Sequence, residues 1–312
     1  MDEDIAVVVV TYNRKLLLLE TLTAILNQTV APKKIYLIDN ASNDGTQEAL
    51  RQAGHLGDAR INYVRLETNT GGSGGFHAGI ANAVSGGHQW ILVMDDDAML
   101  QPDAIERLMH VPELGHDVIA RACLVRDEQG LIQTEHRGFF DPERFQIPLS
   151  EAQYQQPVVN VSYASFVGLA IRRDAIEAVG LPNKEFFIWG DDFEYCLRLT
   201  RMGRIVLVRD SVIIHRDGRM RAQVDSLTAA SNTLLYWKQL CALRNREYIL
   251  RHYGRWTWFG FIYRAFRRVV RIVLFETDKW LKLRWTIAYL RQAISGVFKT
   301  VTPGEWRDIV NR

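Results

Sequence analysis

The feature that most constrains this chain is an apolar stretch that runs straight into three carboxylates, Trp90 to Asp97. Its continuous apolar run is typical of a strand buried on both faces of a mostly parallel sheet. Ligands bind at the carboxyl ends of strands in open α/β sheets, so the three acids would meet a ligand there. Three adjacent like charges are costly unless a cation neutralises them, and Mg²⁺ and Mn²⁺ prefer such oxygen ligands. For an isolated Asp-Asp-Asp, a solvated acidic turn is the alternative.

Three further apolar runs precede this strand, and each is followed by a helical pattern. The runs cover residues 5–10, 35–38 and 61–66, and the helical patterns cover 16–25, 46–53 and 76–84. This alternation predicts an α/β fold with a parallel, doubly wound sheet and right-handed crossovers. Beyond it, strands are expected at 118–125, 158–161, 162–172, 204–208 and 211–214, and short helices at 102–109 and 173–180. Residues 126–156 show no readable pattern.

Polar clusters follow the early strands and should meet at one edge of the sheet. Asp39 can accept a hydrogen bond from an imide or a ribose hydroxyl. The glycine-rich turn from Asn69 to Gly75 lets backbone approach a ligand and exposes amides at a helix N-terminus, where anions bind. A plain loop is the alternative. The glycines do not follow the first strand, as in the dinucleotide fingerprint, and no G-x-x-x-x-G-K-[ST] loop is present, which argues against an NTPase.

A second acidic motif, Trp189-Gly190-Asp191-Asp192, opens a later helical pattern. A carboxylate beside aromatic rings and a second carboxylate tends to have a raised pKa, which suits a general base. The alternative is that the two acids only cap the helix. His215 ends the last predicted strand. A lone histidine is usually structural, but this one can complete a cation site with the first acidic cluster.

Charge is unevenly distributed along the 312 residues, which suffice for one large domain and an appendage. Residues 1–215 hold 19 Lys and Arg against 29 Asp and Glu, a net of −10. Residues 216–312 hold 19 and 7, a net of +12, and six of the eight tryptophans. The two parts are therefore expected to do different things.

Three widely separated cysteines, without CxxC spacing, indicate a reducing compartment and neither a disulfide framework nor a zinc site. The acidic N-terminus does not resemble a signal peptide. No apolar run is long enough to predict a helix that spans a membrane.

Six motifs stand in the order found in a known family: VVVVTYNR, LIDNASNDGT, ETNTGGSGGFHAG, WILVMDDDAML, EFFIWGDDFEYCLR and VIIHRDG. On these, over about residues 4–217, the chain resembles the family 2 inverting glycosyltransferases, which have the GT-A fold and use nucleotide-sugar donors. The glycine stretch and the Trp-Gly-Asp-Asp motif are most similar to the bacterial galactofuranosyltransferase branch, and rhamnosyltransferases share most features. The resemblance implies a GT-A catalytic domain, expected over residues 1–225, and the helical pattern beyond it predicts an extension over 226–312.

The resemblance also implies roles. Asp97 should bind a divalent metal, Mn²⁺ or Mg²⁺, with Asp95 as co-ligand or ribose contact and His215 as a late ligand. Asp192 matches the catalytic base, while Asp191 and Trp189 would bind the acceptor or donor sugar. The family often has Glu-Asp in place of Asp191-Asp192, so either acid can be the base. The donor would contact Thr11, Asn13, Asp39, Asn69, Gly71, Gly72, Gly74, Gly75, Asp95 and Asp96, although the role of Asp96 is not defined.

The implied activity is inverting transfer of galactofuranose from UDP-galactofuranose to a hydroxyl of a growing, lipid-linked cell-surface glycan such as an O-antigen. The alternative within the class is rhamnosyl transfer from dTDP-rhamnose. Two alternatives come from other classes of protein. A non-catalytic sugar-nucleotide-binding subunit would not need these acids, so their presence argues against it. A nucleotidyltransferase should carry a basic glycine-rich loop near its N-terminus, and the sequence has none there.

Residues 226–312 carry basic side chains interleaved with Trp, Phe and aliphatic residues in a helical pattern. Such helices lie in membrane interfaces, which predicts a peripheral protein on the cytoplasmic face of the inner membrane. The alternative is a helical bundle that packs on the catalytic domain or self-associates into a homo-oligomer. Nucleic-acid binding is not expected, because the catalytic part is acidic and no nucleic-acid-binding motif is present.

Overall fold

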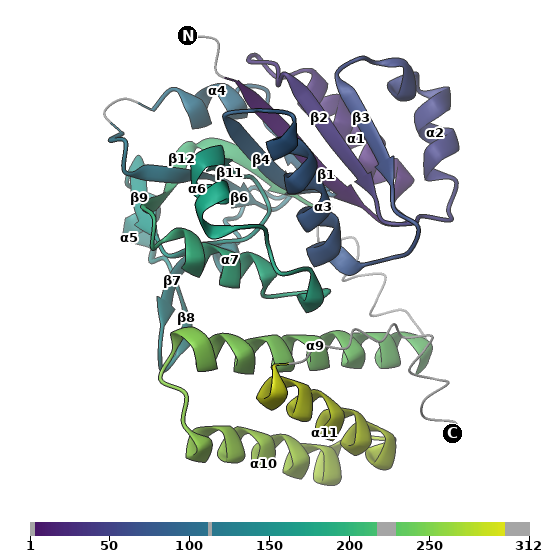
Figure 1. Ribbon diagram of the computed structural model, residues 1–312, viewed down its shortest axis with the longest axis vertical. Coiled ribbons are helices and arrows are strands. Elements are labelled where there is room, and N and C mark those ends of the chain that lie inside the picture. The colour runs from purple at the N-terminus through teal and green to yellow at the C-terminus, as the bar shows by residue number, and fades with distance from the viewer. Residues whose placement is uncertain (1–3, 112–113, 217–228, 297–312) are drawn as a thin grey trace.

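The computed structural model describes residues 4–111, 114–216 and 229–296. Figure 1 shows a central sheet covered by helices, and a separate helical layer beneath it. The main sheet has nine strands in the order β3-β2-β1-β4-β11-β6-β12-β5, and β9 pairs with β12.

The first half of the sheet is parallel, as the alternating pattern predicts. Its strands are β1 (Ile5–Thr11), β2 (Lys34–Asp39), β3 (Ile61–Arg65) and β4 (Trp90–Asp95). β1 lies between β2 and β4, so the polar residues after these three strands meet at one edge. The interiors of β1, β2 and β4 are buried, which explains their apolar sequences, whereas the edge strand β3 is only partly buried.

The second half of the sheet is mixed. Its strands are β5 (Ala98–Leu100), β6 (Val118–Arg126), β9 (Val158–Val161), β11 (Leu169–Arg172) and β12 (Arg204–His215). β11 runs antiparallel to both β4 and β6, because the chain returns through short strands and turns instead of a crossover helix. The two strands expected at 204–208 and 211–214 form one strand, β12, with a register shift between Val208 and Val212.

The segment without a readable sequence pattern forms a small second sheet. β7 (Arg137–Asp141) pairs with β8 (Phe145–Pro148) and with β10 (Tyr163–Ala164), and the short helices η2 (Thr134–His136) and α5 (Glu151–Tyr154) flank it. The single strand expected over 162–172 was wrong, since the chain breaks between β10 and β11. Gly168 has a φ of 76° there, a conformation that ends an extended strand.

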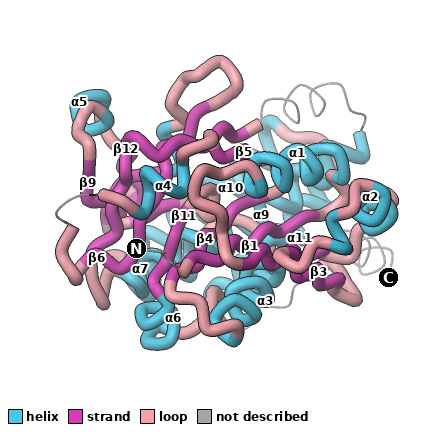
Figure 2. Tube along the Cα trace, turned by 90° about the horizontal axis from the view of Figure 1, so that it is seen from above, coloured by secondary structure: helices cyan, strands magenta, loops and turns pink. Residues whose placement is uncertain are grey.

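Helices cover both faces of the main sheet (Figure 2). On one face lie α3 (Gly71–Ser85), α6 (Arg173–Val179) and α7 (Asp191–Leu199), with η3 (Lys184–Phe186) before α7. On the other lie α1 (Lys15–Leu26), α2 (Thr46–Gln52), η1 (His55–Gly57) and α4 (Ala104–Met109). Alternate residues of β1 divide between the two cores: Val8 and Val10 face α3, while Val7 and Val9 belong to the other core.

The C-terminal layer consists of α9 (Ala229–Tyr253), α10 (Trp258–Phe275) and α11 (Lys279–Ser295). Trp237, Trp285 and Tyr289 form a small core that also includes Phe187 of the main domain. The expected domain boundary at 225/226 lies outside the described residues. All three cysteines are buried and free. Within the described ranges, no helix is both long and apolar enough to cross a membrane.

Candidate active site

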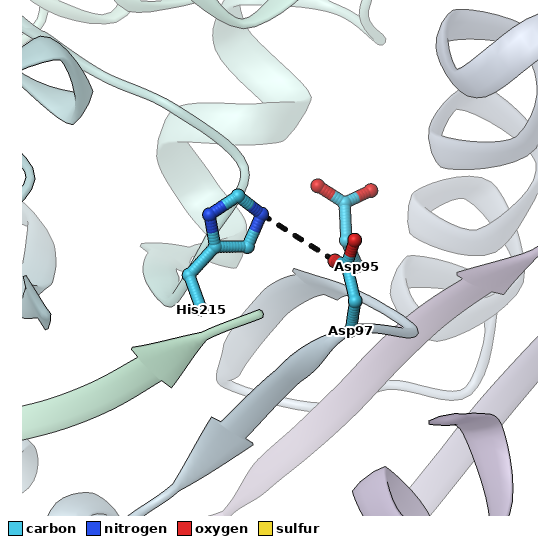
Figure 3. Close-up of side chains that lie close together, drawn as sticks. All are labelled: Asp95, Asp97 and His215. Atoms are coloured by element: carbon cyan, nitrogen blue, oxygen red, sulfur yellow. Dashed lines mark ion pairs between the residues drawn. The ribbon is translucent and has the colours of Figure 1, made fainter. Parts of the chain in front are cut away.

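Asp95, Asp97 and His215 form one cluster (Figure 3). Asp95 ends β4, Asp97 lies in the turn before β5, and His215 ends β12. The antiparallel pairing of β5 with β12 sets Ala98 opposite His215, which brings Asp97 beside the imidazole. One ligand atom from each residue lies within 4.8 Å of the others, and His215 Nε2 is 3.4 Å from Asp97 Oδ1.

The cluster fits a divalent cation. Two carboxylates and one imidazole form an oxygen-rich donor set of the kind that holds Mn²⁺ or Mg²⁺. Asp97 Oδ1 is buried, and its neighbour His215 Nε2, 3.4 Å away, makes no hydrogen bond with it that meets ordinary geometry, as expected of two atoms that could share a metal. Burial and the charge of Asp97 raise the pKa of Asp95 well above its usual range. The two carboxylates therefore disfavour each other's ionised form, and a bound cation would relieve this repulsion.

Asp96, whose role the sequence does not define, holds the site together. Its carboxylate accepts hydrogen bonds from Thr11 Oγ1 at 2.6 Å and from Arg14 Nη1 at 3.1 Å. The same Arg14 nitrogen lies 2.5 Å from Asp97 Oδ2. Burial disfavours the charged guanidinium, but the three carboxylates outweigh burial and raise its pKa. Arg14 is therefore a resident counterion of the acidic cluster.

Gln133 fixes the orientation of His215. Its Oε1 atom can only accept, and it lies 2.9 Å from His215 Nδ1 and 3.1 Å from His136 Nε2. A carbonyl oxygen at this position favours a proton on His215 Nδ1, which leaves Nε2 facing Asp97 and available as a ligand atom. Gln133 lies in the unreadable segment, so the sequence offers no signal for it.

Asp39 and Asn13 lie at the adjacent strand ends and share Ser42. Asp39 is fully buried and accepts from the Ser42 amide and from the Tyr63 hydroxyl, both at 2.7 Å. The backbone N–H of Asn13 donates a hydrogen bond to Ser42 Oγ at 2.9 Å, and Asn13 has a φ of 55°. Both residues therefore shape the loop beside the expected nucleoside position.

The glycine-rich stretch is the start of α3, and the expected glycine turn with a helix beginning at Phe76 was wrong. A Cβ on Gly71 would lie 2.0 Å from Phe187 O, and one on Gly75 would lie 2.4 Å from Val10. The glycines let the helix approach β1 and a neighbouring loop more closely than any side chain would allow. Gly72 differs, because a Cβ there would meet open space.

Several amides at the start of α3 already have partners in the protein. The Gly71 amide donates to Asn69 Oδ1 at 2.8 Å, and the Ser73 amide donates to Phe187 O at 3.1 Å. The side chain of Asn40 joins this helix to β2 by donating to Gly71 O at 2.8 Å. These two backbone amides are therefore not available to an anion, and the expected anion site would have to use other amides in the first turn of α3.

The loop before Asp191 has a strained backbone. Phe187 and Trp189 have φ values of 65° and 62°, and Gly190 has 90°. Left-handed non-glycine residues each cost about 1–3 kcal/mol and persist only where their surroundings fix them. Trp189 is 46% exposed, and its backbone conformation thus presents an indole ring to solvent close to the two acids.

Asp191 and Asp192 begin α7 and differ in accessibility. Asp191 is buried and Asp192 is half-buried. Burial, together with the charge of Asp192, raises the pKa of Asp191 to about 7, although the buried Ser73 hydroxyl favours its charged form. Burial also raises the pKa of Asp192, against the stabilising hydrogen bond from the Phe193 amide at 2.7 Å. Asp192 is therefore the more accessible of the two acids.

The expected site residues fall into two groups. The first lies at the strand ends and comprises Thr11, Asn13, Asp39, Asp95, Asp96, Asp97 and His215. The second group comprises Asn69, Gly71, Gly72, Gly74, Gly75, Trp189, Asp191 and Asp192, and the amide of Ser73 joins its two halves. Four contributors have no assigned role in the sequence motifs: Arg14, Asn40, Ser73 and Gln133. The first three lie inside the six motifs, so their position there could have marked them as site residues.

Comparisons with known proteins agree with this geometry. Residues 6–180 match the family model "Glycosyl transferase family 2". The chain is 27% identical over 306 residues to the galactofuranosyltransferase GlfT1 of Mycobacterium tuberculosis, covering 91% of this chain and 95% of that protein. Over 140 residues it is 31% identical to the undecaprenyl-phosphate 4-deoxy-4-formamido-L-arabinose transferase of Yersinia pestis, covering 43% of this chain and 41% of that protein.

Solved structures show the same fold. GalNAc-T7, crystallised with UDP, GalNAc and Mn²⁺, superposes with a TM-score of 0.61 at 17% identity, covering 95% of this chain and 56% of that one. The mannosyltransferase PcManGT from Pyrobaculum calidifontis, in complex with GDP-Man and Mn²⁺, gives 0.52 at 16% identity, covering 98% and 79%. These neighbours are GT-A glycosyltransferases, and the expected GT-A fold is confirmed. The chain belongs to glycosyl transferase family 2 and is a glycosyltransferase.

Proposed function

We propose that this enzyme transfers galactofuranose from UDP-galactofuranose to a hydroxyl group of a growing cell-surface glycan, with inversion at the anomeric carbon. The observation that carries the proposal is the similarity to GlfT1 along 91% of this chain and 95% of that protein. The relative whose name includes undecaprenyl phosphate supports a lipid-linked acceptor.

In this proposal the two groups of site residues divide the work. Asp39, Asn13 and Thr11 shape the nucleoside side, and the start of α3 with Gly72 borders the diphosphate and sugar. Asp95, Asp97 and His215 would hold Mn²⁺ or Mg²⁺, which supplies Lewis-acid stabilisation of the leaving diphosphate when bound. Arg14 keeps the acids in place.

Asp192 acts as the general base. It takes the proton of the acceptor hydroxyl as that oxygen attacks the anomeric carbon from the face opposite the nucleotide. Trp189, exposed next to it, offers a flat apolar surface on which a sugar ring can stack, and Asp191 orients a sugar hydroxyl. Burial of Asp191 and its raised pKa make it suited to sharing a proton with Asp192.

The protein is further proposed to work at the cytoplasmic face of the inner membrane, held there by residues 226–312. α10 exposes Phe259, Ile262 and Phe266 at three- and four-residue spacing, with Arg267 and Arg271 exposed beside them. A shallow groove between these arginines is lined by Phe266, Val270 and Phe275. Basic and aromatic side chains on one helix suit anionic lipid headgroups.

A donor panel tests the activity. Purified protein is incubated with each nucleotide sugar and Mn²⁺ or Mg²⁺, with membrane extracts as acceptor source, and released nucleotide is measured. UDP release from UDP-galactofuranose that EDTA abolishes and added metal restores is the expected result. Turnover of dTDP-rhamnose alone would identify a rhamnosyltransferase, and turnover of no donor would indicate a non-catalytic subunit. Activity that ignores chelation would remove Asp97 and His215 as metal ligands.

A further inference from the structure

Two adjacent side chains of α9 hold the loop that carries the second acidic motif. Arg244 and Asn245 are 0% and 1% exposed. The two N–H groups of the Asn245 side-chain amide are shared among three carbonyls, with Nδ2 3.1 Å from Phe186 O, 3.1 Å from Ile188 O and 2.8 Å from Trp189 O. Arg244 Nη2 donates to Glu185 O at 3.1 Å and to Phe186 O at 2.9 Å. Four carbonyls of one short loop thus accept hydrogen bonds from two side chains of the C-terminal layer.

The loop needs such support because its own backbone disfavours this shape. Phe187 has φ 65° and ψ −58°, and the Ile188 amide donates to Phe186 O at 2.8 Å across it, which makes a strained γ-turn. Trp189 then has a left-handed φ of 62°. A loop with these angles relaxes unless contacts from outside fix it.

The contacts come from both sides of the loop. On the catalytic side, the Ser73 amide of α3 donates to Phe187 O at 3.1 Å. On the opposite side, the Phe187 ring packs edge-on against Trp237 of α9, with ring centroids 5.1 Å apart. A Cβ added to Gly190 would lie 3.6 Å from Asn245 Cβ and 3.5 Å from Ile249 Cδ1, so α9 packs directly on the residue before Asp191.

We propose that Arg244 and Asn245 are positioning residues for sugar transfer, which set the backbone of Trp189 and the start of α7 so that Asp192 meets the acceptor. This inference rests on the proposed function. It gives the C-terminal layer a part in turnover that is separate from any contact with a membrane. A layer that served only as an anchor would not need to place a buried amide and guanidinium on the carbonyls of the catalytic loop.

The test compares Asn245→Leu with Thr286→Val in the full-length protein. Leucine keeps the volume of Asn245 but removes its donors. Thr286 is equally buried and bonds Tyr236 at 3.0 Å within the C-terminal layer, away from the loop, so Thr286→Val controls for general loosening of that layer. Hydrogen exchange of the amides of residues 186–192, the affinity for UDP with Mn²⁺, and the kcat and KM for UDP-galactofuranose are measured.

For Asn245→Leu, we expect faster exchange in residues 186–192, a kcat lower by about tenfold or more, and UDP affinity and donor KM within about twofold of wild type. Thr286→Val should leave exchange in this loop and kcat unchanged. Arg244→Lys, which can still donate to a carbonyl, should retain more turnover than Arg244→Met.

Wild-type exchange in the loop of Asn245→Leu, or faster exchange with unchanged kcat, would overturn the positioning role. A parallel loss of UDP affinity, or an equal loss of kcat in Thr286→Val, would also overturn it, since both would point to general destabilisation. If the wild-type protein turns over no donor, the proposed function fails. The inference then fails with it as a statement about catalysis, while the exchange data still decide whether Asn245 holds the loop.

Discussion

Asp192 is the residue whose replacement most directly tests the proposed chemistry. Asn keeps its size but cannot accept the acceptor proton, so Asp192→Asn should lower kcat by about 10²–10⁴. Binding of UDP with Mn²⁺ should survive, because the metal cluster lies at the other group of site residues. Calorimetry and initial-rate measurements on the purified variant check both halves.

Asp191→Asn is the matched control, because Asp191 is the adjacent acid at the same helix start. A smaller loss in Asp191→Asn than in Asp192→Asn supports the assignment of the base. Turnover near the wild-type rate in Asp192→Asn would instead move the role to Asp191.

Gln133 provides a residue-scale prediction for the metal site. Gln133→Leu removes the acceptor that holds the proton on His215 Nδ1, so the imidazole loses its fixed tautomer. Loss of such an outer partner typically weakens metal affinity about 10–100-fold. Titration of Mn²⁺ followed by electron paramagnetic resonance measures this without any turnover. Gln129→Leu, an exposed glutamine in the same segment, should bind Mn²⁺ like wild type; equal affinity in both variants would contradict the role of Gln133.

At the scale of elements, two glycines at the start of α3 are expected to have different roles: Gly75 packs against β1, and Gly72 faces open space where a donor could bind. Gly75→Ala forces a Cβ to within 2.4 Å of Val10 and should destabilise the fold by about 1–3 kcal/mol. Gly72→Ala meets open space and should leave the folded state as stable or slightly more so, because alanine favours a helix. Thermal unfolding distinguishes the two.

Gly72→Ala should nevertheless weaken donor binding if this face of the helix borders the donor. Unchanged affinity for UDP and for UDP-galactofuranose in Gly72→Ala would remove Gly72 from the donor site.

The regular elements were predictable where a single periodicity controlled the sequence. β1 to β4 and their helices follow from apolar runs and three- to four-residue spacing. The two acidic clusters and His215 follow from strand and helix ends, whereas the resemblance to the family selects Asp95, Asp97 and Asp192 within those clusters. The start of α3 could not be predicted, because a run of glycines usually indicates a turn. The reason for glycine in this helix is the close approach of Val10 and Phe187, which only the structure shows. Gln133 and Asn245 act through contacts between segments distant in sequence, which no local pattern encodes.

For the whole molecule, the C-terminal layer reconciles the two expectations for residues 226–312. Trp237 and Trp285 are buried in a small helical bundle, while Trp258 and Trp280 are 59% and 82% exposed. A packed bundle and a surface rich in exposed aromatic residues thus exist in the same three helices.

Membrane association should depend on the exposed face of α10. Replacing Phe259, Ile262 and Phe266 together by Ser should lower partitioning into phosphatidylglycerol vesicles by about tenfold or more, because each ring or aliphatic chain contributes apolar burial. Leu16, Leu131 and Met202 are similarly exposed on the catalytic domain, so their triple Ser variant is the matched control. Equal partitioning of both triple variants would contradict a membrane role for α10, and a monomer formed from a wild-type dimer would identify the face as a contact between copies.

The resident arginine in the acidic cluster has a consequence for the order of binding. In the fully ionised form that binds a metal, Asp95, Asp96 and Asp97 carry a formal charge of −3, and Arg14 reduces it to −2. A nucleotide diphosphate approaching this pocket alone meets net repulsion, whereas a divalent ion brings the sum to zero. Cation and nucleotide should therefore bind with positive thermodynamic coupling, each raising the affinity for the other by the same factor.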